Sequence, residues 1–407
     1  MIKRYRYRAY PTPEQENYLT QVFGCVRVVF NDAVALRKQA HVQGQDFPTS
    51  AVLSKQLITE AKKTEDRSWL SGVPAVVLQQ SIRDADRAYS NFFKSLKGQR
   101  KGKKVGAPRF KKRSNKQSAR FTRGNFSKLQ QTTHEVGFVK LAKIGRVRFE
   151  LSRGIPYDPS SVTLIKEPDG RYYLSFVVEA RPRQPKKEKR QAAGIDMGLT
   201  TLASVVCSDG ARESVANPRF LKAKEKRLAS AQRKLSRKKK GSNNREKARV
   251  KVAKLHRKVR ETRLDHYHKL AYRLVNENQV IAVETLNVAG LARTKMAKSI
   301  HDASWSTFIR LLEEKSIEFG RKLIKIDQWE PTSQVCSVCG IKDGKKPLSV
   351  RVWQCQHCNS VLDRDYNAAL NVILAAGLAE SLNDCGEDVR LKLASANLSE
   401  TITHRTD

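Results

Sequence analysis

The sequence has no long apolar segment and no stretch typical of export. Its longest apolar run, residues 369–379, is interrupted by Asn371 and is shorter than the roughly 18 residues that a membrane-spanning helix needs. The opening residues, MIKRYRYRAYP, lack the apolar core of a secretory signal peptide. We therefore expect a cytoplasmic protein that is neither inserted in a membrane nor secreted.

Cysteine is also scarce. Seven cysteines in 407 residues do not indicate the disulfide scaffold of a small secreted protein. Four of them form two CxxC pairs. No Ser-His-Asp or Cys-His arrangement stands out among the eight histidines, so the sequence gives no sign of a hydrolase with such a nucleophile. The remaining cysteines are scattered and are interpreted as buried or incidental thiols: Cys25, Cys207 and Cys385.

Acidic residues are too few to balance the basic ones. The chain holds 79 Lys and Arg against 40 Asp and Glu, a formal charge of +39. Hydrophobic residues make up 39%, which excludes a wholly disordered basic tail. Such an excess favours a polyanionic partner, above all nucleic acid. A basic protein of the membrane surface is the alternative, but no amphipathic anchor or lipidation signal supports it.

The first quarter of the chain predicts a short strand followed by helices. Residues 2–9 alternate as a strand does. Thr12 and Gln15 then fit the capping box of a helix with Pro13 in its first turn. Apolar residues at helical spacing extend this helix and predict two more, over residues 50–63 and 74–97.

Residues 97–123 contain 12 Lys and Arg and no acidic residue. A block of like charge is either solvated or bound to a polyanion. Phe110 and Phe121 are interleaved with the basic side chains, and this mixture suits nucleic acid, because cations neutralise phosphates while aromatic rings stack on bases. The candidate contacts here are Lys103, Lys104, Arg109, Phe110, Lys111, Lys112, Arg113 and Arg120.

Between residues 137 and 180 the pattern becomes that of strands. Two β runs flank Pro168, Asp169 and Gly170, which predict a hairpin turn. The strand at 2–9 is expected to join this sheet, which makes the helical unit an insertion in a β-barrel-like domain. Residues 181–191 are rich in Pro and Lys and predict a linker.

The second half opens with Gly-Ile-Asp-Met-Gly at 194–198 and an apolar run to Val206, which predict two adjacent strands. Residues 219–263 hold 20 Lys and Arg and three acids, with leucines every seven residues. This pattern predicts a basic helical hairpin that turns at 239–244, and Arg237 and Lys238 are candidate nucleic-acid contacts.

Two CxxC pairs separated by 15 residues have the spacing of a four-cysteine zinc ribbon. Each pair bends so that two thiolates face one ion, and Gly340 supplies the turn freedom that this needs. His357 lies inside the second pair, where the geometry disfavours it as a ligand. Four thiolates leave no open coordination position, so the zinc is expected to be structural. The ligands are Cys336, Cys339, Cys355 and Cys358.

Three acidic residues stand where a metal-dependent nuclease would place them. Asp196 lies in a strand beside glycines, which would allow phosphate or metal to approach closely. Glu284 ends another apolar strand, and Asp365 stands at the start of a helix that Asp363 could cap. Such carboxylates can hold a pair of Mg²⁺ ions for phosphodiester hydrolysis. A glycine-flanked aspartate also occurs in actin-like ATPases, so this motif alone does not identify a nuclease. The nuclease interpretation rests on the three acids together with the cysteine pairs and the positive charge.

These segments together resemble the TnpB (OrfB-type) family of insertion sequences, relatives of type V CRISPR effectors. The motifs are GIDMG at 194–198, VETLNVAGL at 283–291, the cysteine ribbon and DRDYNAALN at 363–371. The resemblance continues upstream through RYRYRAYPTPEQ, KKVGAPRFKKR and DASWSTFIRLLEE. It covers nearly the whole chain and fails only in the tail.

The resemblance implies an α+β multidomain fold: a β-barrel-like wedge with an inserted helical recognition lobe, then a RuvC-type, RNase H-like nuclease domain with an inserted zinc ribbon. The tail is expected to be disordered. The expected bounds are 1–12 and 98–180 for the wedge, 13–97 for the lobe, 192–330 and 362–378 for the nuclease, 331–361 for the ribbon and 379–407 for the tail.

The resemblance also implies an RNA-guided, Mg²⁺-dependent DNA endonuclease of a mobile element. Its catalytic triad falls on Asp196, Glu284 and Asp365, with Asp363 the second choice at the third site. The implied partners are a guide RNA from the transposon end and double-stranded target DNA beside a short motif. No obligatory protein partner is expected, and the place of action is the interior of a bacterial or archaeal cell, at the nucleoid.

Two other functions stay open at this point. One is a nucleic-acid-binding accessory or regulator of transposition that does not cut, which the loss of a triad acid would favour. The other is a transposase that carries out strand transfer with the same fold, which would join DNA ends and not only break a target.

Overall fold

The computed structural model describes residues 1–100, 104–127, 129–131, 135–184, 190–347 and 349–379. The chain divides into two compact units. The first unit contains residues 1–180 and 240–253, and the second contains residues 181–239 and the chain from 254 onward. The tail predicted from residue 379 lies, after that residue, outside the described part of the chain.

The first unit is built on an antiparallel sheet of seven strands in the order β2-β6-β7-β1-β5-β4-β3. The predicted hairpin is confirmed: β6 and β7 pair on either side of a turn in which Gly170 has a φ of +88°, a value that favours glycine. The N-terminal strand pairs with β7 and β5, as expected. The strands are β1 Ile2–Tyr10, β2 Gln117–Thr122, β3 Gln130–Gln131, β4 Val136–Leu141, β5 Gly145–Glu150, β6 Ser161–Lys166 and β7 Tyr172–Glu179.

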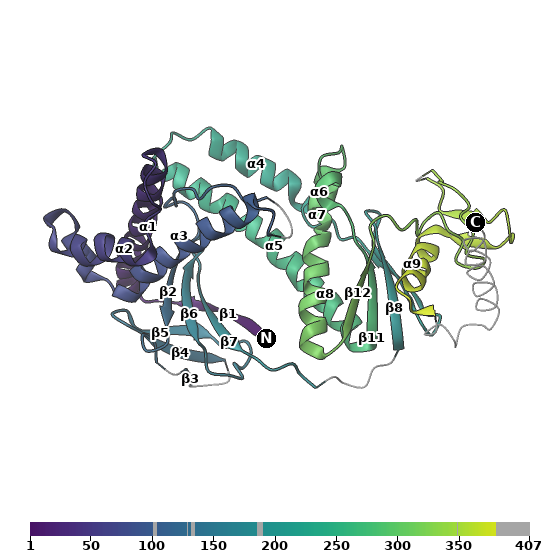
Figure 1. Cartoon of the computed structure of the whole chain (residues 1–407), viewed down its shortest axis with the longest axis horizontal. Helices are drawn as coiled ribbons and strands as arrows, with labels where there is room; N and C mark the ends of the chain where they lie inside the picture. The colour runs from purple at the N-terminus through teal and green to yellow at the C-terminus, as the bar shows by residue number, and fades with distance from the viewer. Residues whose placement is uncertain (101–103, 128, 132–134, 185–189, 348, 380–407) are drawn as a thin grey trace. The chain divides into compact units, whose positions relative to one another are not determined.

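Helices α1 to α3 lie between β1 and β2 in the sequence and on one side of the sheet (Figure 1). The capping box at Thr12 and Gln15 is confirmed: each residue's side chain accepts the other's backbone N–H. The helices share one core with the sheet, which includes Leu19, Val77 and Phe176. The bounds are α1 Pro13–Val42, α2 Ser50–Ser54, η1 Lys55–Glu60, η2 Ala61–Lys63, η3 Glu65–Gly72 and α3 Ala75–Leu96.

Within the part of the chain that the structure describes, one helix has the length and composition of a membrane span, although the sequence predicts none. An 18-residue window of α1 has a mean hydropathy of 1.3. Half of that window is buried inside the structure, and Leu19, Val22 and Val29 belong to the core that the helices share with the sheet. The core helix of a soluble protein passes the same test, and its burial accounts for the apolar composition of α1.

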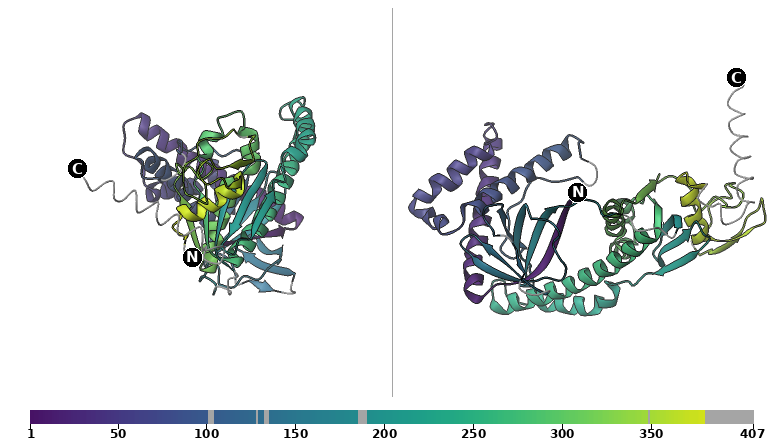
Figure 2. Two further views of the ribbon diagram at one scale, coloured as in Figure 1. Left: turned by 90° about the vertical axis from the view of Figure 1, so that its right-hand side faces the viewer. Right: turned by 90° about the horizontal axis from the view of Figure 1, so that it is seen from below.

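The second unit is built on a five-stranded sheet in the order β10-β9-β8-β11-β12. Strands β8, β9 and β10 form an antiparallel meander, while β11 runs parallel to both β8 and β12. Helices α8 and α9 lie on opposite faces of this sheet (Figures 1 and 2). The bounds are β8 Arg190–Met197, β9 Thr201–Cys207, β10 Arg212–Ala216, β11 Asn278–Glu284, β12 Lys322–Ile326, α8 Trp305–Phe319 and α9 Arg364–Ala375.

The segment predicted to form a basic hairpin contains two main helices, α4 and α5, of unequal length. The second helix is much longer than expected, because it continues beyond residue 263 and its last turns carry Tyr267, Leu270 and Leu274 into the core of the second unit. The predicted linker also ends earlier: Arg190 already belongs to β8 and pairs with Asn278. The remaining elements are η4 Lys222–Lys224, α4 Glu225–Ser236, α5 Asn243–Glu277, α6 Val288–Leu291, α7 Ala297–Ala303, β13 Val352–Gln354 and β14 Val361–Asp363.

Candidate functional site

The side chain of Asp196 lies on the face of the sheet that α9 covers. Alternate residues of a strand point to opposite faces. Ile195 belongs to the core on the α8 side, together with Phe308. Gly194 faces the backbone of α9 at Ala369. Asp196, two residues after Gly194, is therefore on the α9 face, close to the end of β8.

Glu284 lies beside Asp196 on the neighbouring strand. In the parallel pair of β11 and β8, Val283 stands opposite Ile195, so the next residues, Glu284 and Asp196, are at the same level. Val283 packs into the core on the α8 side, so Glu284 also points to the α9 face. Two strand-end carboxylates thus share one face and one level of the sheet.

Asp365 comes from α9, which crosses that same face. It lies in the first turn of the helix, where a carboxylate is favoured by the helix dipole. Asp363, the second choice for this position, is the N-cap: its carboxylate accepts the backbone N–H groups of Asp365 and Tyr366 at 3.0 and 2.9 Å. Capping occupies one oxygen of Asp363, whereas Asp365 is the acid whose charge acts on Asp196.

The other two carboxylates act on the titration of Asp196. The pKa of Asp196 is raised to about 8 by burial and by the charges of Glu284 and Asp365. Burial also raises the pKa of Glu284, and the hydroxyl of Thr332, which donates to its carboxylate, lowers it in part. Carboxylates forced together in this way are neutralised by a proton or by a cation.

The glycines around Asp196 serve packing, which corrects the role expected of them. A Cβ atom on Gly194 would stand 2.1 Å from the carbonyl oxygen of Ala369, so this glycine lets α9 approach the sheet. A Cβ atom on Gly198 would stand 2.6 Å from the carbonyl oxygen of Thr201, in the tight turn to β9. At both glycines the space of a side chain is taken by protein backbone.

A basic residue at the site, Arg351, was missed by the sequence analysis. Its guanidinium lies 3.0 and 3.2 Å from the two oxygens of Asp365 and 3.4 Å from the hydroxyl of Thr200. Arg351 comes from the segment between the two cysteine pairs, and nothing in a single sequence shows that this segment returns to the strand ends. Its charge balances Asp365 in the structure.

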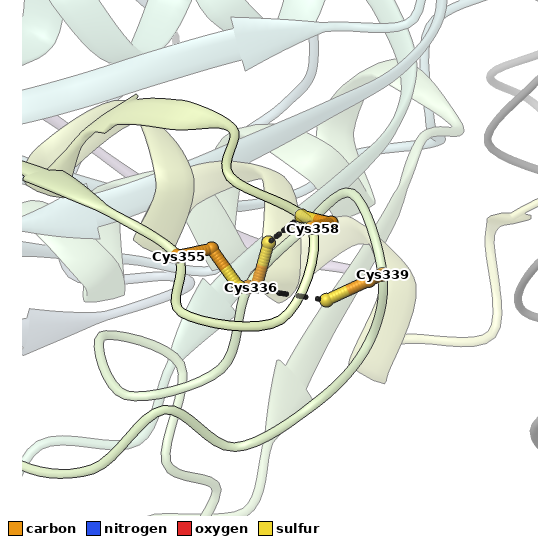
Figure 3. A group of neighbouring side chains, drawn as sticks. All are labelled: Cys336, Cys339, Cys355 and Cys358. Atoms are coloured by element: carbon orange, nitrogen blue, oxygen red, sulfur yellow. Dashed lines mark hydrogen bonds between the residues drawn. The ribbon is translucent and has the colours of Figure 1, made fainter.

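The four paired cysteines form a compact cluster. The sulfurs of Cys336 and Cys358 are 3.7 Å apart, as are those of Cys339 and Cys355. All four sulfurs lie within 4.8 Å of one another, and Figure 3 shows the side chains pointing toward a common centre. Zinc bonded to four thiolates at ~2.3 Å in a tetrahedron sets the sulfurs ~3.8 Å apart. The cluster therefore has the dimensions of a zinc site.

Local structure accounts for this geometry. Gly340, which follows the first pair, has a φ of +74°, and its N–H donates to the carbonyl of Cys336. The second pair follows strand β13 of a short hairpin, in which Trp353 packs against the cysteines. Within the described residues no other set of three or more His, Cys, Asp or Glu side chains has its ligand atoms as close together, so the three carboxylates are more widely spaced than the sulfurs.

Two relatives match this chain over nearly its whole length. A protein of Streptomyces pristinaespiralis named "Putative RNA-guided DNA endonuclease" is 42% identical over 395 residues, which are 96% of this chain and 92% of that protein. "Putative RNA-guided DNA endonuclease InsQ" of Escherichia coli is 30% identical, over 96% of this chain and 95% of that protein. The chain belongs to the TnpB family.

Family descriptions match three parts of this TnpB-family chain. OrfB_IS605, "Probable transposase", covers residues 175–295, with Asp196 and Glu284. "Cas12f1-like, TNB domain" covers residues 305–372, with the four cysteines, Arg351 and Asp365. A "Helix-turn-helix domain" covers residues 1–46, where the structure has strand β1 followed by the single helix α1.

Two solved structures share the fold at low sequence identity. One is titled "Cryo-EM structure of the Cas12f1-sgRNA-target DNA complex" and aligns with a TM-score of 0.59 at 13% identity, over 91% of this chain and 98% of that one. The other, "Structure of the mini-RNA-guided endonuclease CRISPR-Cas_phi3", aligns with a TM-score of 0.54 at 9% identity, over 92% of each chain. The TnpB-family chain thus shares the overall fold of these two structures.

Most of the candidate nucleic-acid contacts are exposed. Lys104, Arg109 and Lys112 are exposed before β2, and Arg237 and Lys238 after α4. The ring of Phe110 is 50% exposed, with the ammonium of Lys38 4.8 Å from its centroid. Lys103 lies outside the described residues.

Two other candidates are turned toward the protein. The ammonium of Lys111 lies 3.8 Å from the centroid of Phe30, and burial lowers its pKa. Arg120 forms an ion pair with Asp84 at 2.9 Å. As they stand, these two side chains are weaker candidates for phosphate contacts than the sequence indicated.

Arg113 lines a cleft of about 650 Å³ in the first unit. The walls come from α1, the segment before β2, the end of β6 and the start of α5. Arg27, Lys166 and Arg249 line the same cleft, so four cations and one acidic residue, Glu246, belong to its walls. Arg249 fixes the start of α5 there by donating to the carbonyls of Ser114 and Pro168. We name this surface the basic cleft.

Proposed function

We propose that this protein is an RNA-guided DNA endonuclease of an insertion sequence, which cuts target DNA beside a short recognised motif. The observation that carries the proposal is the meeting of Asp196, Glu284 and Asp365 on one face of the second unit's sheet, in a chain of the TnpB family. The order of this sheet, three antiparallel strands followed by two parallel ones, supports an RNase H-like, RuvC-type nuclease. The first unit is proposed to supply the wedge and the recognition lobe.

The three carboxylates fit divalent metal ions. They offer the hard oxygen ligands that Mg²⁺ prefers, and burial together with the negative charge of Glu284 and Asp365, which a bound cation would offset, raises the pKa of Asp196. A pair of bound Mg²⁺ ions would supply an activated water and charge stabilisation at the leaving oxygen. The cysteine cluster is proposed to hold one structural zinc ion.

The protein's own residues prepare this site. The strand ends hold Asp196 and Glu284 at one level, and the first turn of α9 brings Asp365 across from them. Asp363 fixes that turn by capping it. Arg351 holds Asp365 in the structure, so its guanidinium must share or give up this carboxylate when a metal ion binds.

The partners proposed are a guide RNA derived from the transposon end and double-stranded target DNA. Guided effectors read sequence by base pairing and hold the heteroduplex by its backbone, which requires basic surface rather than a reading helix. The charge of +39 and the basic cleft support such binding. The proposed place of action is the interior of a bacterial or archaeal cell, at the nucleoid.

A second candidate, strand transfer by a transposase, is favoured by the description "Probable transposase" of the family that matches residues 175–295. The same carboxylates would serve it, because both reactions break a phosphodiester bond. A DNA substrate carrying two element ends separates the candidates: a transposase joins ends to a target, whereas the guided nuclease leaves broken target only.

The direct test is cleavage of a plasmid that carries the guide-matched target, with Mg²⁺ and the cognate guide RNA. We expect Asp196→Ala or Glu284→Ala to lower the cleavage rate by more than about 100-fold, the upper range for residues that merely support a metal ligand. Guide RNA binding should be unchanged in both variants. Full activity in either variant would contradict the triad assignment.

A further inference from the structure

The segment that leads into the first cysteine pair is fastened to α9 by two buried asparagines. Asn367 and Asn371 are 3% and 6% exposed and stand four residues apart, on one face of the helix. The amide nitrogen of Asn371 donates to the carbonyls of Thr332 and Val335, each at 2.7 Å. That of Asn367 donates to the same two carbonyls at 3.4 and 2.8 Å.

The hydrogen bonds also reach the cysteine pair itself. The side-chain oxygen of Asn367 accepts the backbone N–H of Ser337 at 2.9 Å, directly after Cys336. Both side-chain groups of Asn367 are therefore satisfied by one short stretch of backbone, residues 332–337. Such buried and fully bonded polar groups fix a backbone position, because breaking a single bond leaves an unpaired group in the interior.

The other end of this stretch touches the candidate active site. Thr332 is 7% exposed, and its hydroxyl donates to a carboxylate oxygen of Glu284 on β11. The position of this hydroxyl depends on the Thr332 backbone, whose carbonyl both asparagines hold. A continuous set of hydrogen bonds thus connects the first cysteine pair, helix α9 and Glu284.

We propose that Thr332 is a positioning residue for Glu284, and that Asn367 and Asn371 hold it in place. The proposal rests on the proposed function in one respect, since it takes Glu284 as a metal ligand. Thr332 restricts the rotation of the Glu284 carboxylate and leaves its second oxygen to the metal ion. The first cysteine pair sets the same backbone, so assembly of the zinc ribbon also orders a carboxylate on β11, in addition to Asp365.

The test measures metal binding on the full-length protein without a guide. Mn²⁺ is titrated calorimetrically into the purified wild-type protein, Thr332→Val, Thr332→Ser and Glu284→Gln, and the zinc content of each is measured. We expect Thr332→Val to weaken Mn²⁺ binding by about tenfold, as the loss of other residues that support a metal ligand does, with the zinc content unchanged. Thr332→Ser keeps the hydroxyl and should restore the affinity.

The matched control is Thr262→Val, which removes the hydroxyl of an exposed threonine on α5 that bonds within its own helix. It should bind Mn²⁺ as the wild type does. Wild-type affinity in Thr332→Val would overturn the proposal, and so would a loss in Thr332→Ser as large as in Thr332→Val. An unchanged isotherm in Glu284→Gln would also overturn it, because Glu284 would then not bind the metal.

The role of the asparagines is tested by a double-mutant cycle. Asn371→Ala should weaken Mn²⁺ binding while zinc is retained. The double variant that combines Asn371→Ala with Thr332→Val should bind Mn²⁺ no more weakly than the weaker-binding of the two single variants. Both changes release the same carboxylate, that of Glu284. Fully additive losses would contradict action through Thr332. Should Asn371→Ala fail to fold, the comparison of Thr332→Val with Thr332→Ser still decides the proposal.

A guided cleavage assay separates failure of this inference from failure of the proposed function. When the wild-type protein cuts and Thr332→Val needs more Mg²⁺ for half-maximal cleavage, the proposed nuclease function and the positioning role of Thr332 are both supported. When the wild-type protein does not cut but the Mn²⁺ isotherms differ as expected, the positioning role stands and the proposed nuclease activity fails. Cleavage by Thr332→Val with wild-type Mg²⁺ dependence would overturn the positioning role alone.

Discussion

The raised pKa of Asp196 makes the metal-free protein sensitive to pH. In the folded state the carboxyl holds its proton up to about pH 8, while in the unfolded chain it loses the proton near its usual pKa of about 4. The folded state is therefore favoured at low pH, and this contribution to stability falls as the pH rises from about 4 and is gone above 8. Burial and the neighbouring charges of Glu284 and Asp365 are the cause.

We expect the melting temperature of the metal-free protein to decrease as the pH is raised from 6 to 9. The Asp196→Asn variant should lose most of this pH dependence. Mg²⁺ binding must expel the proton, so the apparent Mg²⁺ affinity should rise by up to about tenfold per pH unit below the pKa. Thermal melts at several pH values, with and without Mg²⁺, check both statements. A wild-type curve that matches the Asp196→Asn curve would contradict the raised pKa.

Site residues that lie close together in the sequence could be predicted from their spacing. Residues that reach the site because a distant segment folds back onto it could not. The four cysteines were predicted because the geometry of each pair depends on a few successive residues. Arg351 and Thr332 reach the site because the ribbon folds back on α9, and no pattern in the sequence predicts this contact. The role of Gly194 was misjudged because the helix that packs on it lies far along the chain, at Ala369.

At the scale of elements, the packing of α9 on β8 places Asp365 across from Asp196. Gly194→Ala should disturb this packing, because its new Cβ atom would meet the carbonyl oxygen of Ala369. We expect a loss of about 1–3 kcal/mol in the free energy of unfolding, as in other overpacked cores, together with slower cleavage. Chemical denaturation and the plasmid assay measure the two effects.

Gly24→Ala is the matched control, because a Cβ atom at this position of α1 would meet nothing within 4 Å. Alanine is the better helix former by up to about 1 kcal/mol, so this variant should be as stable as the wild type or more so. If Gly194→Ala is as stable and as active as Gly24→Ala, the close approach of α9 to β8 is not needed at the site.

The zinc ribbon is the second element whose folding bears on the site. Cys336→Ser removes one of four thiolates, so zinc content should fall and cleavage with it, because Asp365, Arg351 and the Thr332 backbone all depend on the ribbon. Elemental analysis and the plasmid assay check this, with Cys25→Ala in the first unit as the control that keeps its zinc. A zinc-free variant with full activity would show that the ribbon is not needed.

Elements with strong local signals were predicted well, and their extents less so. The hairpin of β6 and β7 followed from its turn residues, and α1 from its capping box. Helix α5 was predicted to end near residue 263, although it continues to Glu277. Its first half is mostly basic and its second half carries most of the buried apolar residues, so no single periodicity spans the helix.

For the whole molecule, the charge of +39 predicts nucleic-acid binding that weakens steeply with salt. The basic cleft is a definite part of this surface. Replacing Arg27, Arg113 and Lys166 together by Gln should reduce the slope of log affinity against log salt by about one for each phosphate that these side chains neutralise. Binding of the cognate RNA at several salt concentrations measures this slope.

A variant with equal charge is the control for the cleft. Lys55, Lys63 and Lys269 lie outside the cleft, and their joint replacement by Gln removes the same three charges. The control should leave the slope close to that of the wild type. Equal slopes in the two variants would mean that the cleft residues contribute no more to RNA binding than three positive charges elsewhere on the protein.

A guided nuclease must work with an RNA of defined origin. The most direct test is to express the gene with its native flanking DNA, purify the protein and sequence the RNA that accompanies it. We expect a discrete RNA that ends in sequence from just beyond the element. Heterogeneous cellular RNA that moderate salt removes would contradict it.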